Sequence, residues 1–125
     1  MLLKLIFIAL GSGLGGICRF LLGKVIHPLF LPSFPWGTFV VNILGCLFIG
    51  IIYGFIDRGI TLSENMRLFL TVGFCGGFTT FSTFMHENYL LFTTPQVFTV
   101  VIYAGLSVII GLICVYLGYF ITNQI

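Results

Sequence analysis

Four long apolar runs dominate the hydrophobic pattern of this chain, and short segments rich in proline, charge or other polar residues separate them. Each run has about the 20 residues that an α-helix needs to cross the hydrocarbon core of a bilayer. The pattern therefore predicts transmembrane helices at about residues 5–26, 36–56, 68–90 and 97–121. The expected fold class is an all-α membrane protein, with a single four-helix transmembrane domain over residues 1–125.

The connections between the runs carry residues that end or start helices. Residues 27–35 contain three prolines, and proline cannot continue a helix. Residues 57–65 contain a charged helix stop followed by a Ser-Glu helix start, and residues 93–96 form a proline-containing turn. All three connections are short, so we expect no extramembrane domain between the helices.

Composition identifies lipid as the solvent of this chain. Of its 125 residues, 59% are hydrophobic and 6% are charged, and the mean hydropathy is +1.22. So few polar side chains cannot cover a surface in water. We expect a multi-pass protein of the cell inner (plasma) membrane, with the lipid bilayer as a partner and no nucleic acid partner.

The sequence does not predict an enzyme. The four cysteines fall one to each span without C-x-x-C spacing, and we expect them to behave as small apolar residues: Cys18, Cys46, Cys75 and Cys114. His86 and Glu87 are the only close acid–base pair, and adjacent helix positions point apart.

The distribution of positive charge predicts topology. With four spans, both termini and the second connection share one side of the membrane, which carries Lys4, Arg58 and Arg67. The opposite side carries Lys24 and, if it reaches outward, Arg19. Because the Lys/Arg bias orients membrane proteins, this near balance permits insertion in both orientations. Such a chain can pair with itself head to tail.

Small residues four positions apart indicate where helices pack closely. These steps are common in any helix bundle, so they predict packing without identifying a partner. They are Gly11–Gly15, Ser12–Gly16, Gly50–Gly54 and Ser107–Gly111.

Polar side chains inside the spans are the candidates for function, because hydrocarbon tolerates them only with partners or water. They are Arg19, Asn42, Thr79, Thr80, Ser82, Thr83, Glu87, Tyr103 and Ser107. Arg19 either snorkels from a helix end or takes part in transport. Asn42 either forms an interhelical hydrogen bond or lines a pore.

The segment GFCGGFTTFSTF, residues 73–84, combines these polar groups with glycine and phenylalanine. Phe78, Phe81 and Phe84 recur every three residues, which predicts an aromatic stripe beside a hydroxyl stripe. The adjacent glycines Gly76 and Gly77 weaken the helix, and an opened turn leaves carbonyls and amides that need protein, water or an ion. We therefore predict a break at this pair, of the kind that marks ion pathways in many transport proteins.

The side chains around the predicted break suit an anion. Hydroxyls and the Asn42 amide donate hydrogen bonds, and the edge of a phenyl ring is its positive part. The spans have no carboxylate near their middle that could carry a proton or a cationic substrate. This lining favours a small, hard anion.

Three linked motifs resemble the Fluc (CrcB-type) fluoride channels of microorganisms. They are GFCGGFTTFSTF at residues 73–84, GICRF at residues 16–20 and GTFVVNILG at residues 37–45. The resemblance covers the whole chain in length, number of spans and order of motifs. It implies a fluoride-selective channel that exports F⁻ from the cytoplasm and relieves fluoride toxicity. It also implies an antiparallel dual-topology homodimer with two separate pores.

The resemblance further implies which residues form the sites. The implied fluoride pore comprises Asn42, Phe81, Phe84, Thr38, Thr83, Tyr103, Ser107, Glu87 and Arg19. Main-chain carbonyls of Gly76 and Thr79 from both subunits would hold one Na⁺ at the dimer axis. One departure concerns Gly111, which stands where the polar track of the last helix would have another hydroxyl.

Two other classes remain as alternatives. A small multidrug-resistance-type exporter also has four spans and dual topology, but the family's membrane-embedded glutamate in the first helix is absent from residues 5–26. A non-transporting membrane assembly subunit would be rich in glycine, yet it leaves the clustered hydroxyls unexplained. Fluoride efflux from liposomes separates the channel from both alternatives.

Overall fold

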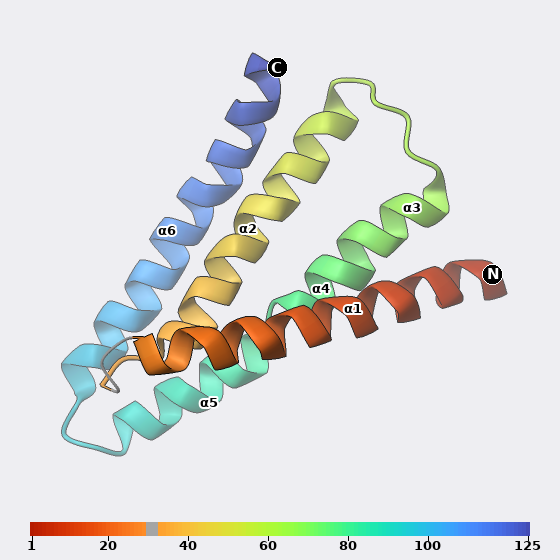
Figure 1. Cartoon of the computed structure of the whole chain (residues 1–125). Helices are drawn as coiled ribbons and strands as arrows, with labels where there is room; N and C mark the ends of the chain where they lie inside the picture. The colour runs from red at the N-terminus through yellow and green to blue at the C-terminus, as the bar shows by residue number, and fades with distance from the viewer. Residues whose placement is uncertain (30–32) are drawn as a thin grey trace.

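A computed structural model describes residues 1–29 and 33–125, and it contains four long apolar helical segments (Figure 1). Three of them are continuous helices: α1 (Leu2–Ile26), α2 (Trp36–Asp57) and α6 (Val97–Gln124). The remaining segment consists of α3 (Glu64–Leu68), a π-helical stretch (Phe69–Cys75), α4 (Gly76–Phe78) and α5 (Phe81–Phe92). By length and composition all four can cross a membrane, which confirms the predicted four-helix membrane fold.

The first connection is described only in part. The end of α1 passes into a short 3₁₀ turn, His27–Leu29, which contains one of the three prolines. Pro32, the second of them, lies outside the described residues.

The helices form two packed pairs. α2 and α6 lie side by side, and α1 crosses the segment that runs from α3 to α5 (Figure 1). Both chain ends and the α2–α3 connection lie toward one end of the molecule, and the α5–α6 turn lies toward the opposite end (Figure 1). At the first of these ends Lys4 forms an ion pair with Glu64, and Arg58 donates a hydrogen bond to the carbonyl of Thr122.

Glycines at the predicted small-residue steps allow the close approach within each pair. A β-carbon on Gly15 would overlap the carbonyl oxygen of Phe74, and one on Gly50 would overlap that of Val115. Backbone atoms cannot move aside as a flexible side chain can, so only glycine fits at these crossings. Gly13 has nothing near its missing β-carbon and is free of this constraint.

The break in the third segment confirms the predicted interruption, but its position differs from the predicted one. Gly76 and Gly77 are helical, and the chain becomes extended at Thr79 (φ −80°, ψ 161°) and Thr80 (φ −149°, ψ 117°). Gly77 serves packing, since a β-carbon there would overlap the backbone of Ser12 in α1. The prediction of a break at the glycine pair is therefore wrong by two to three residues.

The break also divides the predicted aromatic stripe. Phe78 lies before it, is buried, and packs against Phe48 and Phe74 with ring centroids 6.0 and 5.8 Å apart. Phe81 lies after it and is 75% exposed in the single chain. The two rings consequently do not belong to one continuous helix face.

Candidate functional site

Asn42 of α2 holds the open backbone at the break. Its Nδ2 donates a hydrogen bond to the Thr80 carbonyl (3.1 Å), and its Oδ1 accepts one from the Thr80 amide (2.8 Å). An opened turn at membrane depth needs such partners because lipid supplies none. The interhelical hydrogen bond that the sequence left open for Asn42 therefore exists, and it is made to the backbone of the break.

Two amides of the third segment are diverted from their usual helix bonds. In a continuous helix the amides of Thr80 and Thr83 bond to the carbonyls of Gly76 and Thr79. Here the Thr80 amide donates to Asn42, and the Thr83 amide donates to the Thr80 hydroxyl (3.2 Å), which caps the start of α5. The carbonyls of Gly76 and Thr79 thus lose these two helical donors.

Gly76 and Thr79 line a cavity of about 400 Å³ together with Asn42, Cys75 and Phe81. A β-carbon on Gly76 would meet no atom closer than the Thr71 carbonyl, at 4.0 Å, so this glycine is not required for packing within the chain. Carbonyl oxygens at an unwound turn are the ligand type that coordinates Na⁺ in broken membrane helices. The residues present fit the predicted cation site, whose occupancy stays a prediction.

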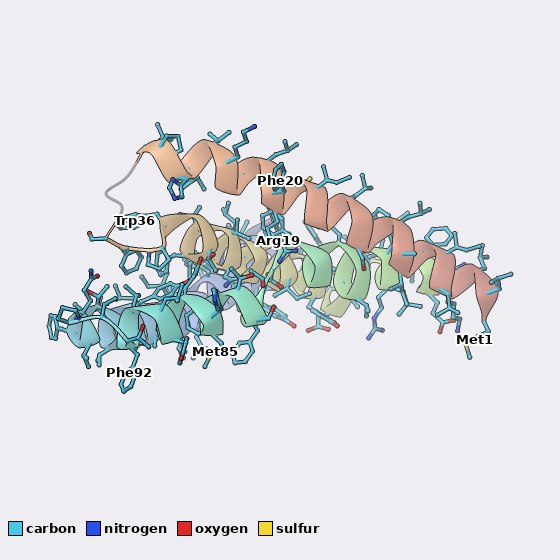
Figure 2. All side chains as sticks on the ribbon, turned by 90° about the horizontal axis from the view of Figure 1, so that it is seen from below. Met1, Arg19, Phe20, Trp36, Met85 and Phe92 are labelled. Atoms are coloured by element: carbon cyan, nitrogen blue, oxygen red, sulfur yellow. The ribbon has the colours of Figure 1, made fainter. Side chains whose placement is uncertain are left out.

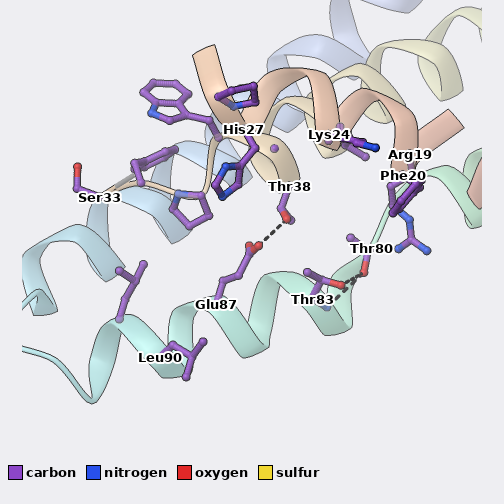
Figure 3. Close-up of a pocket in the computed structure, with 18 of the residues that line it drawn as sticks. Arg19, Phe20, Lys24, His27, Ser33, Thr38, Thr80, Thr83, Glu87 and Leu90 are labelled. Carbon is purple, nitrogen blue, oxygen red and sulfur yellow. Dashed lines mark hydrogen bonds between the residues drawn. The ribbon is translucent and has the colours of Figure 1, made fainter. Parts of the chain in front are cut away.

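Glu87 joins three helices through a polar cluster. Thr38 of α2 donates a hydrogen bond to Glu87 Oε1 (2.7 Å), and Tyr103 of α6 donates one to Oε2 (2.8 Å). The side chains of Thr38 and Glu87 point toward each other across the space between α2 and α5 (Figure 3). We call Thr38, Glu87 and Tyr103 the Glu87 cluster. It unites three residues that the sequence predicted only as separate members of a pore.

Aromatic rings continue from this cluster toward the break. The ring of Phe84 meets that of Tyr103 edge to face, with centroids 4.9 Å apart and planes at 64°. Phe81 follows, with its centroid 6.1 Å from that of Phe84. The predicted pair therefore lies on one helix, and Phe84 of this pair lies beside Tyr103.

A larger cavity of about 970 Å³ opens between the C-terminal half of α1, the first connection, the N-terminal turns of α2 and the length of α5 (Figure 3). We call it the basic chamber, because most of its polar lining consists of basic side chains and hydroxyls, with Glu87 as the one acidic residue among the described residues that line it: Arg19, Lys24, His27, Ser33, Thr38, Thr80 and Thr83. Figure 2 shows Arg19 on the side of α1 that faces the other helices. This placement favours a role for Arg19 in the chamber over snorkelling toward lipid headgroups.

Sequence reasoning missed Lys24, His27 and the capping role of Thr80. A threonine directly before an apolar helical run is a helix-start signal, so the position of the break was open to prediction from Thr80. Lys24 and His27 gave no such signal, because only the path of α1 past α2 and α5 brings them to the chamber.

The last helix carries the remaining predicted positions. Ser107 lies one turn beyond Tyr103, and its buried hydroxyl has no hydrogen-bond partner among the described residues. Gly111, one turn further, is buried against Cys46, whose sulfur would lie 3.3 Å from a β-carbon there. The sulfur of Cys46 therefore occupies the space beside Gly111 where the track pattern would place a hydroxyl.

The family model and the similar proteins that match this chain indicate the same family. Residues 6–119 match the family model described as CrcB-like protein, Camphor Resistance (CrcB). Three relatives are named "Fluoride-specific ion channel FluC". The protein of Azobacteroides pseudotrichonymphae is 42% identical over 98% of both chains, and that of Phocaeicola vulgatus is 45% identical over 96% of this chain and 98% of its own. That of Flavobacterium psychrophilum is 40% identical over 95% and 96%.

Proposed function

This chain belongs to the CrcB family, and from that premise we propose that it is a fluoride-selective ion channel that exports F⁻ from the cytoplasm and relieves fluoride toxicity. One observation of the structure supports this most directly. The basic chamber is lined by Thr80, Thr83 and Glu87, and the ring of Phe84 contacts Tyr103 of the Glu87 cluster, with Phe81 next to Phe84.

The chamber supports recruitment of an anion. Arg19 and Lys24 place two positive charges in a wall whose described residues include one carboxylate, Glu87, and a cavity with an excess of one sign of charge raises the local concentration of ions of the opposite sign. The Thr80 hydroxyl donates to that of Thr83 (2.9 Å), which leaves the proton of the Thr83 hydroxyl free to point elsewhere. Thr83 can therefore donate a hydrogen bond to fluoride at the inner end of the chamber.

In the narrow part of the path, weak donors would take the place of the water molecules that fluoride loses. Ring edges carry the positive end of the aromatic quadrupole, so Phe84 and Phe81 can face a dehydrated anion without a fixed charge. Thr38 and Tyr103 direct their hydroxyl protons to Glu87, so fluoride would compete with that carboxylate for the same donors. Ser107 would supply a further donor beyond Tyr103.

Fluoride efflux from liposomes that contain the purified protein tests the proposed function. Rapid efflux of fluoride with retention of chloride is expected of a selective channel. Retention of both ions would contradict the proposal and favour an assembly subunit. A small multidrug-resistance-type exporter would instead exchange organic cations for protons, and α1 contains no acidic residue to serve that exchange.

We further propose that the working unit is an antiparallel dual-topology homodimer with two fluoride pores. The small bias of positive charge supports it, since one side carries Lys4, Arg58 and Arg67 and the other carries Lys24 and, if it reaches outward, Arg19. Phe81 supports it too, because a pore-lining ring that is 75% exposed in the single chain needs another surface to enclose it.

We expect a tag placed after Gln124 to be reachable from both sides of the membrane in a population of cells. The physical reason is the small Lys/Arg bias, which favours neither orientation strongly. Protease accessibility in intact and in opened cells measures the two fractions. A matched variant with three lysines added at the C-terminus should insert mostly one way and lose fluoride efflux. A single orientation of the unmodified chain would contradict the antiparallel dimer.

Na⁺ is proposed as a structural ion at the dimer axis, held by the carbonyls of Gly76 and Thr79 from both subunits. The support is chemical: both carbonyls lose the amides of Thr80 and Thr83, and both residues line the same cavity. The ion would be coordinated by the lone pairs of these neutral oxygens, and the chain would contribute no charged ligand.

We expect purification in N-methyl-D-glucamine in place of Na⁺ to reduce fluoride efflux and dimer stability. Unpaired carbonyls at membrane depth are costly, so losing their ion should open or loosen the break. Efflux and the dimer fraction on size exclusion measure the effect, and restoring Na⁺ should recover both. Undiminished efflux and dimer after verified Na⁺ removal would contradict a required ion.

A further inference from the structure

Phe34, in the connection before α2, contacts the aromatic side of the Glu87 cluster. Its ring centroid lies 5.1 Å from that of Tyr103, with the planes at 73°, so the two rings meet edge to face. The same ring packs against Trp36 (4.6 Å) and Phe39 (5.5 Å) at the start of α2. Phe34 also lines the basic chamber. It thus connects the chamber wall with a buried residue of α6.

The ring of Tyr103 contacts two other rings, and each of them meets it edge to face. Phe34 contacts its ring from the first connection, and Phe84 contacts it from α5 at 4.9 Å and 64°. Its side chain is 0% exposed, and its hydroxyl donates a hydrogen bond to Glu87. A tyrosine ring that turns or tilts moves its hydroxyl away from a fixed acceptor. The rings of Phe34 and Phe84 therefore limit how far the Tyr103 ring can tilt away from Glu87.

We propose that Phe34 is a positioning residue of the fluoride path, which acts by holding the Tyr103 ring so that its hydroxyl stays on Glu87. The inference rests on the proposed function and adds to it a residue from outside the three motifs that carry the family resemblance. Phe34 offers no hydrogen bond of its own, so its effect passes through Tyr103. Edge-to-face geometry is specific to aromatic rings, so an aliphatic side chain of similar volume cannot replace it.

The test compares three single variants and one double variant in the liposome efflux assay. Phe34→Leu removes the ring and keeps apolar bulk, and we expect fluoride efflux to fall about three- to tenfold from the usual strength of an aromatic pair. Phe34→Tyr keeps the ring and should retain efflux. Tyr103→Phe removes only the hydroxyl. In that background Phe34→Leu should cause little further loss, because the hydroxyl that Phe34 positions is gone.

Phe120→Leu is the matched control. Phe120 is an exposed ring on α6 that stacks on Tyr116, away from the chamber and the path, so this variant should conduct like the unmodified protein. Full efflux by Phe34→Leu, or equal fold losses with and without the Tyr103 hydroxyl, would overturn the inference while leaving the proposed function intact. No efflux from the unmodified protein would instead contradict the proposed function.

A readout that does not depend on conduction completes the test. Fluorotyrosine incorporated at position 103 reports the ring environment by ¹⁹F NMR in detergent. We expect the resonance to shift or average in Phe34→Leu and to stay in place in Phe34→Tyr and Phe120→Leu. An unchanged resonance in Phe34→Leu would show that Phe34 does not hold Tyr103 and would overturn the inference even if efflux fell.

Discussion

Replacing Phe81 by isoleucine should reduce fluoride efflux by at least about tenfold, while the protein still assembles. A tenfold loss corresponds to about 1.4 kcal/mol added to the barrier for fluoride. Isoleucine keeps apolar bulk but has no ring edge to face a dehydrated anion. The Phe81 ring is 75% exposed in the single chain, so its own chain packs little against it. The loss should therefore appear in flux and not in folding. Efflux from liposomes, scaled to the amount of dimer, measures it.

Phe92→Ile supplies the matched control on the same helix. Phe92 ends α5 and is 64% exposed, so the substitution removes a similarly exposed ring that lies outside the proposed path. We expect normal efflux from this variant. If Phe81→Ile also conducts normally, or if both variants lose efflux and dimer together, Phe81 has no specific role in the path.

Replacing Asn42 by leucine should abolish most fluoride efflux by a different route. Leucine cannot bond to the Thr80 amide or carbonyl, and each buried backbone group left unpaired costs about 1–3 kcal/mol. The Thr80 amide would then be free to return to the Gly76 carbonyl, as in a continuous helix. We expect the break to close, with loss of efflux and loss of the dependence of dimer stability on Na⁺.

Asn88→Leu is the control for the Asn42 substitution. Asn88 is also buried in a span, at 7% exposure, but its amide only donates to the Phe84 carbonyl of its own helix. Its Oδ1 has no partner among the described residues, so leucine removes a costly unpaired atom. Efflux should persist in Asn88→Leu. Efflux near the normal rate in Asn42→Leu would refute the role of Asn42 at the break.

The two substitutions also distinguish the elements of the proposed path. Phe81→Ile changes the lining and leaves the break intact, so its residual dimer should still respond to Na⁺. Asn42→Leu changes the break itself, so efflux and the response to Na⁺ should be lost together. Glu87 and its partners lie on other turns of the helices and should keep their hydrogen bonds in both variants.

The position of the break shows where local reasoning stops. Two adjacent glycines weaken a helix, and on that ground Gly76 and Gly77 were the predicted site. Both are helical in the structure, and α1 approaches Gly77 so closely that no β-carbon fits there. The Thr80 hydroxyl then caps α5, and Asn42 compensates the open turn from 38 positions away in the chain. Gly77 serves helix contact, and the threonines and asparagine form the break.

The sequence by itself determined the membrane environment, the four spans and the residue types available to a pore, since these depend on local properties: the length of each apolar run and the cost of every polar group inside it. It could not determine which polar groups meet. Thr38, Glu87 and Tyr103 come from three helices, and the basic chamber exists only because α1 diverges from α2 and α5. Hydrogen bonds of this kind depend on how far apart the helices lie. Close backbone contacts set that distance within each pair, at Gly15 between α1 and the third segment and at Gly50 between α2 and α6. Only the tertiary structure shows these contacts and the partners that they bring within reach.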